Sequence, residues 1–277
     1  MPDKPKLGQN FLVDVQAARR IVTALGDLAG HTVVEIGPGR GAITEILAAQ
    51  ARHLVAVELD RGLAAGLRSR YEAEAERVKV VEQDVLQFDF AAAAKGAGER
   101  LRVAGNLPYA ITSPILLKLA KSHAALDLAV LMVQREVADR VTAVAGSRDY
   151  GLLSATVRMY GPAERLFTLP PAAFSPQPKV YSTVFRWRFA PRFAELRVDE
   201  AGFLCFLRKV FAQKRKTLAN NLRAAGIGHG DAAQALRDVG IDEKIRAEAV
   251  PVEGLAALWR NLCLDPRFAG QHRARKL

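Results

Sequence analysis

The stretch Thr32–Gly41, TVVEIGPGRG, decides the fold of this chain. Its β-branched first half predicts a buried strand, and residues 42–47 after it predict a helix. A strand that passes through a glycine loop into a helix is how a doubly wound α/β sheet presents backbone N–H groups to a nucleotide-like ligand. The glycines are spaced G-x-G-x-G, unlike the dinucleotide pattern G-x-G-x-x-G, and Pro38 removes one donor. A nucleotide-type loop is therefore predicted, with a plain structural turn as the alternative.

Carboxylates follow the next two predicted strands at their carboxyl ends. Residues 53–58 predict a second strand ending in Glu58, and Asp60 is placed to cap the helix that follows. An acid about 20 residues after a glycine loop is positioned to bind a ribose diol. Glu58 is therefore assigned to a ribose, with an ordinary surface acid as the alternative. Residues 78–81 predict a third strand, after which Asp84 could accept a hydrogen bond from an adenine amine.

A fourth predicted strand, residues 101–104, runs through Gly105 into the motif Asn106-Leu107-Pro108-Tyr109. The Asn106 side-chain carbonyl can accept a hydrogen bond from an exocyclic amine, and Pro108 stiffens the loop. The Tyr109 ring offers a flat surface for a nucleobase. The motif predicts an amine-binding loop, and a simple strand-to-loop turn is the alternative.

The remaining elements of the first 190 residues complete an α/β pattern. Asp14 is a predicted N-cap, and Ser113 with Pro114 is predicted to start a helix. Further strands are expected at 127–133, around 165–167 and at 181–189, with helices at 134–144 and 151–159. The predicted inward faces are Ala18, Ile21, Val22 and Leu25 in the first helix, and Val137, Val141 and Val144 in the helix at 134–144.

Two flanking segments leave alternatives open. The basic arm Lys4–Leu12 could close over a ligand or pack across the domain. The proline-rich loop at 170–179 contains Phe174, which could oppose Tyr109 and sandwich a base; proline loops are otherwise plain connectors.

The composition changes after Pro191, where strand patterns end and helical patterns continue. We therefore predict an α/β domain at 1–190 and a smaller helical domain at 191–277. Residues 208–223 present a basic helix face interleaved with apolar positions, which is typical of phosphate contacts, although a solvated helix face is the alternative. The candidate RNA-contacting residues are Lys214, Arg215, Lys216 and Arg223. The tail from Gln271 to Leu277 is also basic.

Composition favours an intracellular protein with a polyanionic partner. The formal net charge is +11, and 50% of the residues are hydrophobic, enough for a sizeable core. Cys205 and Cys263 form neither a disulfide framework nor a zinc pattern, and no histidine cluster predicts a metal. No apolar run approaches the ~20 residues that span a bilayer. A cytoplasmic protein without a metal is expected.

These motifs together resemble the ribosomal RNA adenine N6,N6-dimethyltransferases, with the bacterial small-subunit enzymes most similar. The resemblance covers nearly the whole chain and is carried by LGQNFL at 7–12, VEIGPG at 34–39, the motif at 106–109, FSPQPKV at 174–180 and FAQKRKT at 211–217. It implies a Rossmann-like sheet, S-adenosyl-L-methionine as methyl donor, and two adjacent adenosines in a hairpin near the 3′ end of 16S ribosomal RNA as substrate. The implied partner is the small ribosomal subunit or its precursor, bound by a monomer.

The resemblance also implies roles for individual residues. Asn10 and Leu12 would cover the cofactor, Gly37 and Gly39 would approach its methionine part, and Glu58 would hold its ribose. Asp84 and Val85 would meet its adenine. The Asn106 side-chain oxygen and the Leu107 carbonyl oxygen would accept hydrogen bonds from the target N6 amine. These hydrogen bonds would localise the lone pair that attacks the methyl group. The chain departs from the family at Ala110, where asparagine is frequent, so the side-chain hydrogen bond that asparagine could make from that position is absent.

Three alternatives remain at this stage. A resistance-type methyltransferase acting on 23S ribosomal RNA shares the catalytic half, but usually lacks a comparable helical end with QKRKT at 213–217. A ribosome-assembly factor could keep the fold without the chemistry. A nicotinamide-dependent oxidoreductase is disfavoured by the glycine spacing and by the motif at 106–109.

Overall fold

The computed structural model describes residues 9–264 of the 277-residue chain. Two units emerge from the internal contacts: a sheet unit, formed by the residues up to 138 together with 162–190, and a helical unit, formed by 139–161 together with the residues from 191 onward. The helical unit thus includes residues 139–161, which the predicted division at 190 had placed in the first domain. The basic segment Lys4–Gly8 and the basic tail 271–277 lie outside the described residues.

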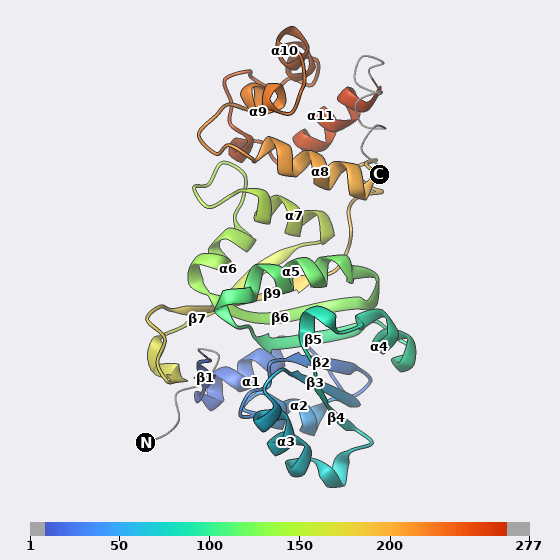
Figure 1. Cartoon of the computed structure of the whole chain (residues 1–277), viewed down its shortest axis with the longest axis vertical. Coiled ribbons are helices and arrows are strands. Elements are labelled where there is room, and N and C mark those ends of the chain that lie inside the picture. The colour runs from blue at the N-terminus through green and yellow to red at the C-terminus, as the bar shows by residue number, and fades with distance from the viewer. Residues whose placement is uncertain (1–8, 265–277) are drawn as a thin grey trace. The chain divides into compact units, whose positions relative to one another are not determined.

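The sheet unit contains a seven-stranded mixed sheet with the order β4-β3-β2-β5-β6-β9-β7 (Figure 1). Neighbours among the first five strands run parallel, and β9 is antiparallel to both β6 and β7. This is the α/β architecture that the sequence predicts. The strands are β2 (Thr32–Ile36), β3 (His53–Glu58), β4 (Val78–Glu82), β5 (Leu101–Asn106), β6 (Leu126–Gln134), β7 (Ala163–Leu169) and β9 (Ser182–Arg188).

Helices flank the sheet and bury its central strands. All five residues of β2 are buried, as expected for a parallel strand that is covered on both faces. The buried core joins apolar residues of α1, such as Ile21, to Val33 of β2 and Val130 of β6. The helices of this unit are α1 (Val15–Thr23), α2 (Thr44–Gln50), α3 (Arg61–Arg70), α4 (Phe90–Ala97) and α5 (Thr112–Lys121).

Aspartate caps fix where α1 and α3 begin. The Asp14 carboxylate accepts a hydrogen bond from Ala17 N at 2.9 Å, and Asp60 accepts one from Leu63 N at 3.0 Å. Both caps confirm the prediction. The prediction for Ser113 was wrong, because α5 begins one residue earlier at Thr112, whose hydroxyl instead donates to the Pro108 carbonyl at 3.1 Å.

Two further details differ from the sequence prediction. The helix α6 (Arg135–Thr142) ends before Val144, which is 59% exposed and not inward as predicted. The arm before α1 contains a short strand that the sequence did not reveal. This strand, β1 (Phe11–Leu12), pairs antiparallel with β8 (Phe174–Ser175) of the proline-rich loop, so this part of the arm packs across the sheet unit.

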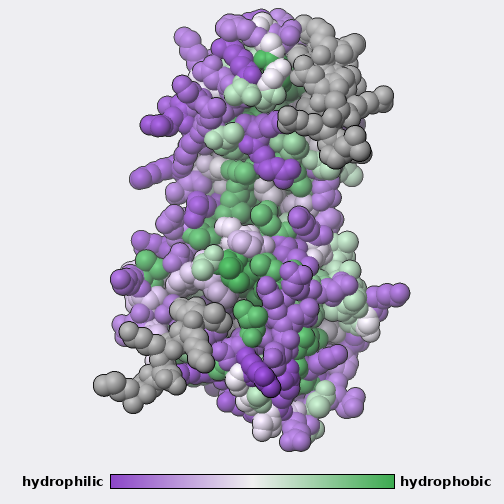
Figure 2. Space-filling view, viewed as in Figure 1, coloured by the Kyte–Doolittle hydropathy of each residue, from purple (hydrophilic) through white to green (hydrophobic). Residues whose placement is uncertain are grey.

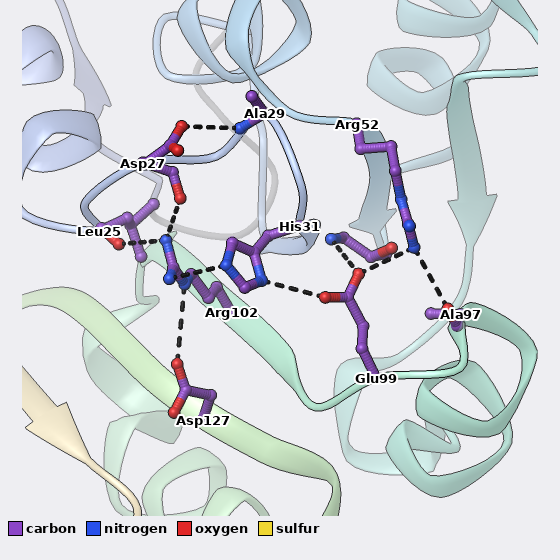
Figure 3. Close-up of polar contacts among 10 residues, drawn as sticks. Leu25, Asp27, Ala29, His31, Arg52, Ala97, Glu99, Arg102 and Asp127 are labelled. Atoms are coloured by element: carbon purple, nitrogen blue, oxygen red, sulfur yellow. Dashed lines mark hydrogen bonds and ion pairs between the residues drawn. The ribbon is translucent and has the colours of Figure 1, made fainter.

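A polar cluster ties together segments at the amino ends of the parallel strands (Figure 3). The Glu99 carboxylate, just before β5, accepts hydrogen bonds from Thr32 N at 2.8 Å and from the Arg52 guanidinium at 3.1 Å, and its other oxygen lies 3.0 Å from His31 Nδ1. The opposite nitrogen of His31, Nε2, lies 2.9 Å from Nη2 of Arg102. Since arginine can only donate, His31 fits as the neutral tautomer that donates from Nδ1 to Glu99. Glu99 and Arg102 thus fasten the end of the sheet opposite to the carboxyl ends.

The helical unit has its own buried core of aromatic residues. Tyr160 is 1% exposed; its hydroxyl donates to Glu200 Oε1 at 2.7 Å and its ring meets Phe193 edge-on, with centroids 5.2 Å apart. The buried Tyr150 ring lies 6.1 Å from Phe211. The helices of this unit are α7 (Leu152–Tyr160), α8 (Glu200–Val210), α9 (Leu218–Ala224), α10 (His229–Asp238) and α11 (Val252–Leu264), while α6 leads into it from the sheet unit.

The face of the molecule drawn in Figure 2 is mainly hydrophilic. Figure 2 shows polar and charged side chains over most of the visible face, interrupted by apolar ones. Between residues 9 and 264, no helix is both long and apolar enough to cross a membrane.

Candidate active site

A cavity of about 260 Å³ opens at the carboxyl ends of β2, β3, β4 and β5. It lies beside β2, the strand that pairs with β3 on one side and β5 on the other. Such a switch in strand order is where doubly wound sheets bind ligands. The structure brings together here all the residues predicted to bind a cofactor or to act on the substrate amine: Asn10, Leu12, Gly37, Gly39, Glu58, Asp84, Val85, Asn106, Leu107, Pro108 and Tyr109.

A side chain at Gly39 would crowd the Phe11 ring and would strain the backbone. The φ of Gly39 is +57°, and a Cβ there would lie 3.0 Å from Cδ1 of the Phe11 ring. The Arg40 guanidinium lies on the same ring, 4.5 Å from its centroid. Phe11 and Arg40 therefore form one wall of the cavity, and neither was predicted as a site residue.

Glu58 supports the glycine loop as well as facing the cavity. One carboxylate oxygen accepts a hydrogen bond from Gly39 N at 2.9 Å, and the other accepts one from Asp60 N at 2.9 Å. A carboxylate has about four acceptor sites, so two remain for a ligand hydroxyl. Glu58 is only 2% exposed, which makes these sites accessible from the cavity alone.

Asp84 occupies the adjoining strand end. Its Oδ1 accepts a hydrogen bond from Leu86 N at 2.9 Å and begins a short 3₁₀ helix, η2 (Val85–Gln87). The carboxylate is thereby fixed at the cavity, next to the buried apolar side chain of Val85. A polar acceptor beside an apolar surface suits a purine ring that carries an exocyclic amine.

The orientation of the Asn106 side chain is fixed by Asn10. The Asn106 Nδ2 group donates to the Asn10 carbonyl oxygen at 2.9 Å. Because a carbonyl can only accept, the amide NH2 must face Asn10, and the amide oxygen faces elsewhere. No donor among residues 9–264 is paired with that oxygen, which leaves it free to accept a hydrogen bond from a ligand in the cavity.

Gly105 allows β5 to approach β2 closely just before Asn106. A Cβ at this position would lie 2.8 Å from the carbonyl oxygen of Ile36 and 3.2 Å from Leu107 Cδ2. A contact that short requires the strands to separate. The glycine therefore determines how near Asn106 lies to the glycine loop on β2.

The rest of the motif is held by backbone and hydroxyl contacts. Leu107 N donates to Met132 O at 3.0 Å, and Pro108 O accepts from Ile111 N at 3.2 Å. The Tyr109 hydroxyl lies 2.7 Å from the Ser182 hydroxyl, and burial raises the pKa of Tyr109, so the ring stays a neutral phenol. Ala110 lines the cavity next to it and carries no side-chain hydrogen-bonding group.

The structure does not bring Phe174 into the cavity. Phe174 is the first residue of β8, and its side chain is 2% exposed and belongs to the buried hydrophobic core. Phe174 is not among the residues that line the cavity. A stacking role for this ring would require it to leave the core and stays a prediction from the sequence.

Glu35 is a wall residue that the sequence analysis missed. It lies within β2, is 1% exposed, lines the cavity, and its Oε2 has no hydrogen-bond partner. Burial raises its pKa to about 8; the neighbouring Thr44 hydroxyl lowers it in part and the Glu58 charge adds to the rise. The sequence feature that could have identified Glu35 is an acidic residue within an otherwise mostly apolar predicted strand.

The predicted RNA-contacting residues lie in the helical unit. Lys214, Arg215 and Lys216 are exposed and form a loop between α8 and α9, not a helix face as predicted, because Thr217 caps α9 by accepting from Asn220 N at 3.3 Å. The buried Asn221 side chain fixes the loop by bonding to both Gln213 N and Gln213 O, at 3.1 and 3.3 Å. Arg223 follows on α9 and is partly buried.

Metal ligands are not gathered in the part of the chain that the structure describes. Within residues 9–264 there is no group of three or more His, Cys, Asp or Glu residues that could hold a metal ion. Cys205 is exposed and Cys263 is partly buried.

Known proteins match the chain over nearly its whole length. A family model described as ribosomal RNA adenine dimethylase matches residues 2–262. Ribosomal RNA small subunit methyltransferase A of Acidobacterium capsulatum is 58% identical over 259 residues, which cover 94% of this chain and 91% of that protein. The protein of the same name from Koribacter versatilis is 52% identical over 270 residues and covers 94% of both chains.

Solved structures share the fold at lower sequence identity. A dimethyladenosine transferase from Plasmodium falciparum superposes with a TM-score of 0.76 at 22% identity, covering 90% of this chain and 95% of that one. The 23S rRNA methyltransferase ErmE gives a TM-score of 0.70 at 24% identity, covering 91% of this chain and 99% of that one. These two likenesses establish the fold.

Proposed function

This chain belongs to the ribosomal RNA adenine dimethylase family, and we propose that it dimethylates the N6 amines of two adjacent adenosines in a hairpin near the 3′ end of 16S ribosomal RNA. It is an enzyme that uses S-adenosylmethionine as its methyl donor. The observation that carries the proposal is the free amide oxygen of Asn106 at the cavity that Tyr109 also lines. A role in small-subunit biogenesis follows from this substrate.

The cavity fits S-adenosylmethionine by the character of its walls. The buried, unpaired Oε2 of Glu35 indicates that a polar ligand group completes the site, and the amino-acid end of this compound carries such groups. Because Gly39 has no side chain, the Phe11 ring lies against the loop and forms a wall of the cavity. We propose that Asn10, Leu12, Gly37 and Gly39 surround the methionine part.

Glu58, Asp84 and Val85 are proposed to hold the nucleoside part. The two remaining acceptor sites of the Glu58 carboxylate suit the vicinal hydroxyls of a ribose. Asp84 would accept a hydrogen bond from the adenine amine, and Val85 would contact the ring. Because both carboxylates already accept backbone hydrogen bonds, they are positioned before the ligand arrives.

Asn106 and Leu107 are proposed to act on the target amine. S-adenosylmethionine supplies an electrophilic methyl group when bound, so no metal or covalent enzyme intermediate is needed. The difficulty lies in the substrate, because the N6 lone pair is delocalised into the purine ring. The Asn106 amide oxygen and the Leu107 carbonyl oxygen would each accept a hydrogen bond from one N6 hydrogen. These two hydrogen bonds would direct the lone pair toward the methyl group. Asn10 fixes the Asn106 amide in the orientation that this requires.

Tyr109 is proposed to stack on the target base. Taking an adenine out of its stack costs a few kcal/mol, and stacking on an aromatic ring offsets this by about 1–3 kcal/mol. The hydrogen bond between the Tyr109 and Ser182 hydroxyls fixes one end of the ring and leaves its faces to the base. After the first transfer, the methylated N6 releases one of its two hydrogens as a proton and keeps the other, so its lone pair is restored for the second round.

Mapping the methylated adenosines tests the function directly. The protein is added, with S-adenosylmethionine, to small and large subunits from cells that lack both modifications, and primer extension locates dimethyladenosine. We expect two adjacent stops near the 3′ end of 16S ribosomal RNA and none in 23S ribosomal RNA. Stops in 23S RNA would identify a resistance-type enzyme, and cofactor binding without methylation would indicate an assembly factor.

The loop Lys214–Lys216 is proposed to contact RNA phosphates. Replacing all three residues by glutamine should weaken RNA binding and reduce the slope of log affinity against log salt by up to about 0.7–0.9 per lost contact. Filter binding between low and moderate salt measures that slope. The matched control replaces Lys244 and Arg246, two exposed cations of the same unit, by glutamine. An equal loss of slope in the control would show a general charge effect and contradict a contact by this loop.

We also propose that the enzyme acts as a monomer in the cytoplasm, where bacterial small subunits are assembled.

A further inference from the structure

Tyr181 is an exposed aromatic residue next to the site but outside the cavity. It is 47% exposed, whereas the next residue, Ser182 at the start of β9, is fully buried. Ser182 is the residue whose hydroxyl lies 2.7 Å from the Tyr109 hydroxyl. One residue and one hydrogen bond therefore separate the exposed Tyr181 ring from the ring proposed to hold the target base. Tyr181 does not line the cavity, and the proposed chemistry does not use it.

Arg135 holds Tyr181 in place by two contacts. Its backbone N–H donates to the Tyr181 carbonyl oxygen at 3.0 Å, and its guanidinium carbon lies 5.3 Å from the centroid of the Tyr181 ring. An aromatic ring that is fixed at both backbone and side chain loses little conformational freedom when a ligand stacks on it.

Two exposed cations accompany this ring: one contacts it, and the other is near it in the chain. Arg135 is exposed beside it, and Lys179 is exposed two residues earlier in the chain. Exposed aromatic rings set among cations are typical of surfaces that bind single-stranded nucleic acid, in which bases stack and phosphates meet the charges. The apolar part is one ring and Val180, which is too small for the core of a protein–protein interface.

We propose that Tyr181 and Arg135 form a stacking platform for an unpaired nucleotide adjacent to the adenosine that is being methylated. This inference rests on the proposed function of the cavity. A single strand that delivers one base to Tyr109 leaves its neighbouring nucleotide outside the cavity. Tyr181 is an exposed ring one residue from Ser182, whose hydroxyl contacts Tyr109. The neighbour stacks on the Tyr181 ring, Arg135 and Lys179 meet its phosphates, and the target base is thereby positioned.

Steady-state methylation of unmodified small subunits tests the platform. Tyr181→Ala should raise KM for the subunits about tenfold, the effect of losing one stacked base, with kcat and the affinity for S-adenosylmethionine unchanged. Tyr181→Phe keeps the ring and should behave as the wild type. Tyr181→Leu keeps apolar bulk without a ring and should resemble Tyr181→Ala. Val180→Ala, at a neighbouring residue that is 42% exposed, is the matched control and should leave KM unchanged.

The outcomes separate this inference from the function on which it rests. If the wild type makes no dimethyladenosine, the proposed function fails. If the wild type is active and Tyr181→Ala keeps its KM, the platform is wrong while the function stands. Full rescue by Tyr181→Leu would also overturn it, because apolar bulk without a ring would then suffice. A change in kcat or in cofactor affinity without a change in KM would assign Tyr181 to maintaining the cavity and contradict the platform.

Discussion

Asn106→Ala is expected to reduce the methylation rate by at least about 10²–10³, the effect of removing one preorganised hydrogen-bonding group from an active site. The variant loses the amide oxygen proposed to accept an N6 hydrogen, and it loses the contact to Asn10 that fixes the amide. Asn106 is partly exposed, so the fold should remain intact. The loss should appear in kcat, with most of the RNA affinity retained.

A radiolabelled methyl donor and unmodified small subunits measure this effect. Asn106→Asp is the informative companion: its carboxylate cannot donate to the Asn10 carbonyl, so it should also be inactive. Asn261→Ala makes the same change on α11 in the helical unit and should remain active. Near-normal dimethylation by Asn106→Ala would remove Asn106 from the catalytic machinery.

Glu35→Gln is expected to stabilise the protein at alkaline pH and to change it little near pH 5. Burial raises the Glu35 pKa from about 4.5 to about 8, so between these values the folded protein keeps a proton that the unfolded chain has released. The free energy of unfolding of the wild type therefore falls as the pH rises through this window, by at most about 1.4 kcal/mol per pH unit. Glutamine has nearly the same shape and no charge, so the unfolding free energy of the variant should not fall with pH in this way.

Urea unfolding at pH values from 5 to 9 tests this prediction. The difference in unfolding free energy between Glu35→Gln and the wild type should grow with pH up to about 8, to a few kcal/mol, and then level off. Glu45→Gln makes the same chemical change at an exposed position on α2 and should follow the wild type throughout. A pH-independent difference for Glu35→Gln would mean that Glu35 is ionised in the folded protein.

The sequence predicted those parts of the site that depend on local chemistry. Gly37, Glu58 and Asp84 lie where strands predicted from apolar runs end, and parallel strands bring their carboxyl ends to one edge of a sheet. Chain order therefore sufficed to place them around one cavity. Asp14 and Asp60 were predictable for a related reason, because a cap is a contact across three residues.

Contacts between distant residues were not predictable in the same way. The pairing of β1 with β8 joins segments about 160 residues apart. Each strand has only two residues, which is too few for its sequence to predict its partner. Phe174, the β8 residue that the sequence predicted to stack on a base, is buried. The loop at Lys214–Lys216 was predicted as part of a helix face because basic and apolar residues are interleaved over 208–223. In the structure Thr217 is the N-cap of α9, so the three cations precede that helix. Glu35 was missed because its importance lies in burial.

Because the two units are interleaved along the chain, neither is encoded by one continuous segment of the gene. The helical unit is made of two separate segments, because Tyr150 and Tyr160 of residues 139–161 pack against Phe211 and Phe193 respectively. In the chain, β7 and β9 of the sheet unit lie between these two segments. A protein cut after Ala190 would keep all seven strands and expose both tyrosines. Neither unit can therefore pass to another protein, by recombination or by design, as one uninterrupted piece of gene.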